Sequence, residues 1–438
     1  MSVSTQVSRS GQGDAKITRR VLVGTVIGTT IEWYDFFVYA TTAALVFGEL
    51  FFEPLGRENA VLNQVVAFAT IGISFLFRPL GAVIAGHLGD RLGRKQTLVL
   101  TLLLMGGATT AMGLLPTYAQ IGFWAPLILM VLRILQGLSA GGEWGGAALM
   151  SVEHAPRGRR GISGAYPQIG APIGMFTASL AVSVMTVAVG MENFVAWGWR
   201  IPFLLSAVLI LAGYIIRRAT EESPVFEELR ARRRELSAPL RVLVKKHPWE
   251  VVRGALVFAG NNAAGWVLIA YIPSYGVNTL GLAQGEVFAV TGLAAAGWVA
   301  TTLWSGSVSD RLGRGKTFQI GYVALIVWMI PMFLLIEHEA IWSLGVAVVA
   351  LTFGLGFSYG PLSALYAEMF PAEVRYSGTS ISYALGTIVG GAFAPMIAEI
   401  LLASTGWSPS IGLYLMALAF ISLLAVRGVQ DRRDAPLT

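Results

Sequence analysis

The chain has 438 residues, of which 55% are hydrophobic and 13% charged, and its formal net charge is +6. Roughly a quarter of the residues of a soluble domain are charged, so this composition excludes an ordinary soluble protein and predicts a membrane protein. The sequence contains no cysteine, which excludes disulfides, thiolate metal sites and cysteine nucleophiles. We expect no metal and no other cofactor.

Twelve apolar blocks follow one another along the chain. Each is long enough to cross ~30 Å of hydrocarbon as a helix of about 20 residues. They cover residues 20–49, 61–86, 96–115, 124–151, 161–189, 199–217, 251–279, 286–307, 317–336, 341–366, 376–402 and 411–427. The predicted fold class is therefore an all-α membrane protein with twelve transmembrane helices.

A short basic loop occurs twice. Gly86–Lys95 reads GHLGDRLGRK and Gly306–Lys316 reads GSVSDRLGRGK, so that Asp90 and Asp310 are half a chain length apart. Duplication of this kind is typical of carriers in which two similar bundles move against each other. We therefore expect two pseudo-symmetric six-helix bundles, and transport as the function.

The distribution of basic residues predicts the topology. All but four of the 31 lysines and arginines fall in segments that share one side of the membrane with both termini. The positive-inside rule then predicts a multi-pass protein of the inner (plasma) membrane with both termini cytoplasmic. The expected segments are a tail over 1–19, bundles over 20–217 and 251–427, a polar linker over 218–250 and a tail over 428–438.

Ionisable residues within the apolar blocks are functional candidates, because charge is costly in hydrocarbon. In the first half these are Glu32, Asp35, Arg78, Arg133 and Glu143. By helix rise, Asp35 and Arg133 are expected to meet in the outer half of the bundle and to form the proton-coupling pair. Glu32 and Glu143 are rival proton carriers, and the alternative for Asp35 and Arg133 is a permanent ion pair that fixes two helices.

Arg78 is the candidate for the substrate. It lies 12 residues before Asp90, hence ~18 Å above the loop and close to the midplane, where carriers bind substrate. Its guanidinium offers a planar fork for a carboxylate, and Pro79 is expected to kink the helix. The alternative is that Arg78 neutralises Glu32 or Glu143 within the wall.

Neutral polar and aromatic residues complete the predicted substrate site. Amides and phenols suit hydroxyl and carboxylate oxygens, and ring faces suit a flat ring or an onium group. The candidates are Tyr39, Gln168, Asn261, Asn262, Trp266, Tyr359 and Tyr383. For each single Tyr or Trp the alternative is helix packing or interface anchoring, whereas the adjacent amides at 261 and 262 need partners in hydrocarbon.

The paired loops predict a cytoplasmic gate. An aspartate there can accept hydrogen bonds at a neighbouring helix N-terminus and pair with arginine, contacts that would hold one conformer closed. The predicted gate residues are Asp90, Arg91, Arg94, Asp310, Arg311 and Arg314. The four histidines lie in loops or at helix ends and no Walker sequence is present, so a membrane enzyme and an ATP-driven pump are both disfavoured.

Several stretches resemble the metabolite:proton symporter family of the major facilitator superfamily. Besides the paired loops, these are GTTIEWYDFFVY at Gly28–Tyr39, RPLG at Arg78–Gly81, RILQGLSAGGEW at Arg133–Trp144 and WRIPF at Trp199–Phe203. The resemblance implies the twelve-helix fold and uptake of a small organic acid with a proton. SVEHAPR at Ser151–Arg157 and YPQIG at Tyr166–Gly170 are most similar to the shikimate-transporter branch.

The alternative substrates within that family are osmolytes such as proline and glycine betaine. Osmosensing members carry a long charged C-terminal extension, whereas this chain ends soon after its last apolar block, which disfavours an osmosensor; the midplane arginine favours an acid. GAPIGM at Gly170–Met175 lacks the Gly-Pro-x-x-Gly-Gly core typical of drug antiporters, which favours symport. The expected partners are a small-molecule substrate, protons and the lipid bilayer; we expect a monomer and no nucleic acid.

Overall fold

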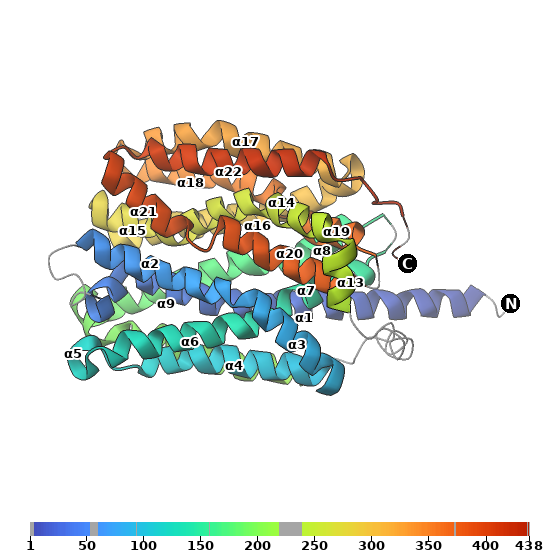
Figure 1. The fold of residues 1–438 in the computed structure, drawn as a ribbon, viewed down its shortest axis with the longest axis horizontal. Helices are drawn as coiled ribbons and strands as arrows, with labels where there is room; N and C mark the ends of the chain where they lie inside the picture. Colours follow the sequence, from blue (N-terminus) through green and yellow to red (C-terminus); the bar gives the residue numbers. More distant parts are fainter. Residues whose placement is uncertain are drawn as a thin grey trace.

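The computed structural model describes residues 4–52, 60–92, 94–156, 158–218, 239–371, 374–435 and 437, without the side chains at 4–20, 44, 60, 86–92, 94–98, 216–218, 239–241 and 244. Helices account for most of these residues, and none of them lies in a β-strand. Figure 1 shows the helices running roughly side by side, with both ends of the chain at one end of the bundle. We call this end the terminal end.

The first half begins with α1 and ends with α11. In chain order its elements are α1 (Ser4–Thr42), η1 (Ala43–Phe52), α2 (Ala60–Leu76), α3 (Arg78–Leu92), α4 (Arg94–Leu114), α5 (Tyr118–Ile121), α6 (Trp124–Ala140), α7 (Glu143–Glu153), α8 (Arg160–Gln168), α9 (Gly170–Val189), α10 (Met191–Asn193), η3 (Phe194–Gly198) and α11 (Arg200–Arg218). Helix α1 thus begins within the stretch predicted to be a tail.

The second half follows the predicted linker, most of which lies outside the described residues. In chain order its elements are α13 (Pro239–Lys246), α14 (Pro248–Trp266), η5 (Val267–Tyr271), α15 (Ile272–Ser274), η6 (Tyr275–Thr279), α16 (Gln284–Leu312), α17 (Arg314–Ile336), α18 (Ile341–Phe357), α19 (Leu362–Met369), α20 (Arg375–Gly390), α21 (Ala394–Thr405) and α22 (Pro409–Arg427). The division of the chain into two bundles stays a prediction.

The expected number of membrane spans is confirmed. Among the described residues, ten helical stretches are long and apolar enough to cross a membrane. An eleventh is the pair Met191–Gly198 and Arg200–Ile215, bent by 56°. Val99–Leu114 is a shorter apolar helix that belongs to the 21-residue α4, and it completes the twelve.

Several spans are interrupted midway. Pro79 lacks an N–H, and the second span divides at Phe77 into α2 and α3. Further breaks occupy residues 141–142, 169, 358–361 and 391–393. Broken helices in membrane carriers leave backbone groups that can line a binding site, so these breaks mark the region in which to look for one.

Glycine pairs spaced four residues apart allow close helix contacts in the first half. A methyl group on Gly137 would lie 1.9 Å from the carbonyl oxygen of Ser74, and one on Gly141 would lie 2.0 Å from that of Arg78. Small residues at this spacing let membrane helices approach until their backbones touch. Helix α6 is therefore pressed against α2 and α3.

Glycine pairs spaced four residues apart also occur at helix contacts in the second half. Gly356 and Gly360 approach α16 at Thr301 and Ser305, as Gly137 and Gly141 approach the second span. Gly386 and Gly390 on α20 approach α14, and a methyl group on Gly390 would lie 2.0 Å from the carbonyl oxygen of Ala259. In the first half, Gly170 and Gly174 bring α9 close to α1, where added methyl groups would lie 2.1 Å from Oγ1 of Thr29 and 2.8 Å from Cβ of Trp33.

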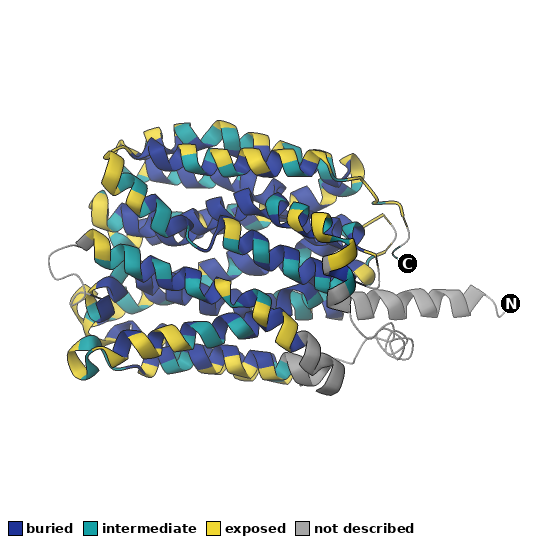
Figure 2. Cartoon of the chain, viewed as in Figure 1, coloured by how far each residue is buried: buried dark blue, intermediate teal, exposed yellow. Residues whose placement is uncertain are grey.

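Burial is distributed as a membrane requires. Figure 2 shows buried residues concentrated inside the bundle and exposed ones on its outer helices. The outer faces carry large apolar side chains, such as Val187 at 81%, Val327 at 66% and Leu211 at 60% exposure. Lipid tails provide a medium in which such faces are stable, whereas water does not.

Candidate functional site

Arg78 occupies the centre of the candidate site. It is the first residue of α3, directly after the break in the second span, and only 2% of it is exposed. Its Nη2 lies 3.9 Å from Oε1 of Glu32 on α1, which is an ion pair longer than a hydrogen bond. Nε and Nη2 of Arg78 have no hydrogen-bond partner in the protein, although buried donors are almost always satisfied.

Aromatic rings cover part of the Arg78 guanidinium. Its Cζ lies 4.4 Å from the ring centre of Phe36, 4.6 Å from Phe75 and 5.5 Å from Trp33. Cations are stabilised over such faces. Trp266 of the second half packs against the same group, with its ring centre 5.0 Å from that of Phe75 and 6.4 Å from that of Trp33. The predicted Trp266 therefore joins the two halves beside Arg78.

A small cavity lies on another side of Arg78. Its volume is about 10 Å³, roughly that of one water molecule. Both halves contribute to its wall, which is formed by Arg78, Ala140, Gly141, Trp144, Gly145, Ser380, Tyr383 and Ala384. The Trp144 and Tyr383 rings stack with centres 3.7 Å apart. In this conformation the halves are closed around the site.

Gln168 connects this stack to the tenth span. Its Oε1 accepts a hydrogen bond of 3.0 Å from Nε1 of Trp144, and its Nε2 donates to the carbonyl oxygen of Tyr359 over 3.4 Å. The Tyr359 ring packs on Phe258 with centres 5.9 Å apart. Of the predicted substrate residues, Gln168, Tyr359, Tyr383 and Trp266 thus gather around Arg78.

Arg133 lies in a neighbouring cluster within the first half, and its Cζ is 5.4 Å from the ring of Phe36, which also contacts Arg78. Nη2 of Arg133 donates to Oγ of Ser74 over 2.7 Å, and further N–H groups donate to carbonyl oxygens of α2 and to Oε1 of Gln136. Its Cζ lies 3.9 Å above the ring of Tyr39, whose hydroxyl is 2.5 Å from Oγ1 of Thr70. The predicted Tyr39 thus belongs to this cluster.

The expected contact between Asp35 and Arg133 is not formed. Both side chains are described, and they share neither an ion pair nor a hydrogen bond; instead Asp35 accepts a hydrogen bond of 2.6 Å from Oγ of Ser206 on α11. Gln136, one turn beyond Arg133, takes one of the guanidinium donors and itself donates to Oγ1 of Thr109 over 3.0 Å. The close approach of α6 to α2 supplies carbonyl oxygens for the remaining donors.

The two adjacent asparagines differ in their surroundings. Nδ2 of Asn261 donates to the carbonyl oxygen of Leu355 and to Oγ of Ser358, at 2.9 and 2.8 Å. Asn261 thereby provides a hydrogen-bond donor to a backbone carbonyl at the end of α18, where the tenth span is interrupted. Oδ1 of Asn262 is buried without a hydrogen-bond partner. Asn262 thus retains a free acceptor, whereas the donor group of Asn261 is used within the fold.

Glu143 is the first residue of α7, immediately after the Gly141–Gly142 break, and it is 4% exposed. A carboxylate at this position faces the positive end of the helix dipole. Its place beside the break leaves it close in sequence to Trp144, which lines the cavity. The proton-carrying role assigned to Glu143 stays a prediction.

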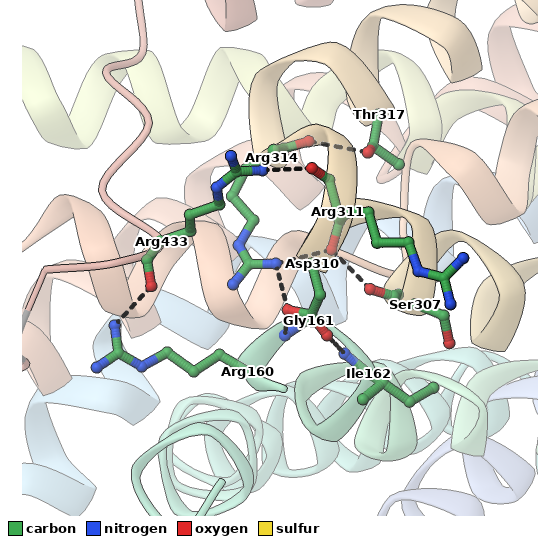
Figure 3. Close-up of polar contacts among 12 residues, drawn as sticks. Arg160, Gly161, Ile162, Ser307, Asp310, Arg311, Arg314, Thr317 and Arg433 are labelled. Atoms are coloured by element: carbon green, nitrogen blue, oxygen red, sulfur yellow. Dashed lines mark hydrogen bonds and ion pairs between the residues drawn. The ribbon is translucent and has the colours of Figure 1, made fainter. Parts of the chain in front are cut away.

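The second basic loop makes both contacts that its chemistry predicts (Figure 3). The Asp310 carboxylate accepts hydrogen bonds from the backbone N–H groups of Gly161 and Ile162, at 2.7 and 3.0 Å. These are orphan donors in the first turn of α8. Asp310 also pairs with Nη1 of Arg314 at 2.8 Å, and Nη2 of Arg314 lies 3.0 Å from Oε1 of Glu368. The contact joins the two halves at the terminal end.

The other predicted gate residues are less informative. The Arg311 side chain is exposed, and the side chains of Asp90, Arg91 and Arg94 in the first copy of the loop lie outside the described residues. The gating role of all six stays a prediction.

Residues of the site that were not singled out from the sequence include Thr109, Gln136, Trp144 and Ser206. Gln136 and Trp144 lie within the RILQGLSAGGEW stretch, so the same motif that indicated Arg133 contained them. Ser206 and Thr109 are ordinary hydroxyl residues of apolar helices, and nothing local distinguishes them from hydroxyls that bond to their own helix.

Comparisons with known proteins agree with this architecture. Residues 25–395 match the model of the Major Facilitator Superfamily. In structure, the chain is similar to the proton:xylose symporter XylE bound to 6-bromo-6-deoxy-D-glucose, with a TM-score of 0.76 at 15% identity over 97% of this chain and 98% of that one. At this identity the likeness shows the fold alone.

Curated relatives are similar over almost the whole chain. The inner membrane metabolite transport protein YhjE of Escherichia coli (strain K12) is 39% identical over 95% of both chains. The shikimate transporter of the same organism is 35% identical over 99% of this chain and 100% of its own, and a putative proline/betaine transporter of Staphylococcus aureus (strain COL) is 34% identical over 94% and 88%. The chain therefore belongs to the Major Facilitator Superfamily, a family of membrane transporters.

Proposed function

We propose that the protein is a proton-coupled symporter that imports a small organic acid by alternating access, with Arg78 receiving the substrate carboxylate. One observation carries this proposal: a buried guanidinium between the two halves with two nitrogens that have no hydrogen-bond partner. A carboxylate can accept two parallel hydrogen bonds from such a group. The Glu32 carboxylate, at 3.9 Å, is an ion-pair partner that lies outside hydrogen-bonding distance of the guanidinium.

The aromatic groups around Arg78 favour an acid over an osmolyte. A carrier for betaine would be expected to place aromatic faces around the substrate's quaternary ammonium. Here the faces of Phe36, Phe75 and Trp33 are in contact with the protein's own guanidinium. The similarity to the shikimate transporter agrees with an acid such as a hydroxylated monocarboxylate or a related dicarboxylate.

Asp35 is our candidate for the proton carrier. It is 1% exposed, and the hydroxyl of Ser206 is its hydrogen-bond donor. Intramembrane carboxylates of this kind form proton relays in carriers. Because Arg133 bonds Gln136, which in turn bonds Thr109, we propose that Asp35 and Arg133 communicate through this pair of residues when the helices shift. Glu32 and Glu143 are the rival carriers.

A symporter for proline or glycine betaine is the second candidate. The 34% identical relative named as a putative proline/betaine transporter favours it. So does the cluster of Phe258, Tyr359, Tyr383 and Trp298 in the second half, whose ring faces suit an onium group.

The test is uptake into proteoliposomes with an imposed pH gradient, using labelled shikimate, α-ketoglutarate, proline and betaine. We expect accumulation of an acid, and a loss of about 10- to 100-fold in Arg78→Ala, because hydrogen bonds to charged groups contribute roughly 1.5–3 kcal/mol. Arg427→Ala, which removes an exposed cation at the end of α22, is the matched control. Accumulation of betaine or proline alone, or of an acid equally well by Arg78→Ala, would contradict the proposal.

A further inference from the structure

The described part of the C-terminal tail, residues 428–435 and 437, lies across the terminal end and contacts both halves. The guanidinium of Arg160, at the start of α8 in the first half, donates to the carbonyl oxygens of Arg433 and Ala435, at 3.3 and 2.7 Å. Arg433 in turn donates from Nη1 to the carbonyl oxygen of Arg311 on α16, at 2.7 Å. Figure 3 shows Arg433 between Arg160 and the α16–α17 turn.

The tail also covers the second basic loop. A methyl group on Gly313 would lie 2.0 Å from Oδ2 of Asp431, so the loop and the tail are in direct contact. Oδ1 of Asp431 accepts the backbone N–H of Arg433 over 3.2 Å, which fixes the turn that presents Arg433. Nearer the membrane, Arg253 donates to the carbonyl oxygen of Gly428 over 2.5 Å.

The last described residue of the tail packs on a seam between the halves. Leu437 contacts an apolar cluster formed by Leu149 and Val152 of α7 together with Ala364 and Ala367 of α19. Its carbonyl oxygen lies 3.4 Å from Nη1 of Arg375, and that nitrogen is 3.8 Å from Oε1 of Glu153 on α7. Leu437 thus packs against a cluster that is built from both halves.

We infer that residues 430–435 together with Leu437 are a strap that holds the terminal end closed and must detach before that end can open. The contacts of Arg160 with the tail, and of Leu437 with α7 and α19, join elements that separate when the halves move apart. This inference rests on the alternating-access cycle proposed above. It assigns a conformational function to a segment outside the membrane spans.

The strap is weaker than the gate beneath it. Its polar contacts join arginine N–H groups to neutral backbone carbonyls at an accessible surface, where water competes for both groups. The Asp310 contacts with α8 and Arg314 are more buried and charge-assisted, hence stronger. Loss of the strap is therefore expected to shift the equilibrium between closed and open states without abolishing closure.

The absence of cysteine from the sequence allows a direct test. Exposed Arg159 in the first half and exposed Ser307 in the second are replaced by cysteine and spin-labelled. The distance distribution is then measured by pulsed electron paramagnetic resonance on the full-length protein, without substrate or gradient. We compare the deletion of residues 430–438, Arg160→Ala and Leu437→Ser with the matched control Arg432→Ala, whose side chain makes an exposed contact with Gln430 within the tail.

We expect the population at long distance to rise several-fold in the deletion and by a smaller factor in Arg160→Ala and Leu437→Ser, with no change in Arg432→Ala. An unchanged distribution in Arg160→Ala and Leu437→Ser, in protein that elutes as an intact monodisperse peak, would overturn the inference even if the deletion variant fails to fold. Because the measurement needs neither substrate nor protons, its result is separate from the uptake test of the proposed function.

Discussion

The two halves of the molecule are packed alike but carry different polar groups. Glycines four residues apart bring equivalent spans together in both halves, at Gly137 and Gly141 in the first and at Gly356 and Gly360 in the second. The buried charged residues in the middle of the first half are Glu32, Asp35, Arg78, Arg133 and Glu143, whereas those described in the second half are Arg314, Glu368 and Arg375, at the terminal end.

Individual positions make the contrast clearer. Arg133 stands four residues before Gly137, and Thr352 stands four residues before Gly356, where its hydroxyl bonds within its own helix to Val349. Arg78 contacts Gly141, and in the second half Ser305 contacts Gly360. A duplicated bundle can therefore keep its backbone packing while its interior charges diverge. This difference leads us to assign proton coupling to the first half.

The largest expected effect is on coupling. Asp35→Asn is expected to reduce gradient-driven accumulation to the level seen without a gradient, because the amide cannot exchange a proton, while substrate exchange at equilibrium remains within about twofold. The control in the second half is Glu399→Gln, which alters a partly buried carboxylate on α21 and should leave accumulation intact. Equal losses in both variants, or full accumulation by Asp35→Asn, would contradict the proposal that proton coupling belongs to the first half.

The second-largest expected effect is on stability, and it follows from the close glycine contacts that both halves have. Gly137→Ala and Gly390→Ala each place a methyl group within 2.0 Å of a carbonyl oxygen, and overpacking of this kind costs typically 1–3 kcal/mol. Both should lower the midpoint of thermal unfolding of the purified protein. Gly107→Ala, which meets nothing within 4 Å, should leave it unchanged. A lower midpoint in only one of the two variants would contradict the inference that the two halves are packed alike.

The smallest expected effects distinguish two adjacent residues of α14. Asn261→Ala should destabilise the protein by about 1–3 kcal/mol, since it leaves the Leu355 carbonyl without its partner, and should leave the KM of the remaining folded protein unchanged. Asn262→Ala should leave stability nearly unchanged, because its Oδ1 has no hydrogen-bond partner, and should raise the KM. Uptake kinetics and thermal unfolding of both variants decide between these roles, and a reversed pattern would contradict them.

The sequence predicted the fold well, because twelve apolar blocks and a duplicated loop each have a direct structural meaning. It also predicted the contacts of Asp310, since a loop aspartate beside a helix N-terminus follows from local chemistry. Asp35 and Arg133 are not in contact in this conformation, and their pairing stays a prediction. Helix rise gives the height of a residue but not the direction of its side chain, and Gln136 on the next turn satisfies the guanidinium first.

The contacts between the halves could not be predicted from one sequence. The stack of Trp144 on Tyr383 and the bridge through Gln168 join residues about 190–240 positions apart, and no periodicity within a span encodes that meeting. The Arg78–Glu32 pair was among the alternatives considered, because both residues are charges that need compensation in hydrocarbon.

The water-sized cavity beside Arg78 has a consequence for measured affinity. A site of about 10 Å³ cannot admit an organic acid, so the conformer described here is not the one that binds. The apparent dissociation constant of a substrate equals its intrinsic value divided by the fraction of molecules that are open. Each 1.4 kcal/mol by which the closed state is favoured over the open state therefore weakens the observed affinity tenfold. A high Kd in a binding assay would then reflect the stability of the closed conformer as much as the contacts between the substrate and its site.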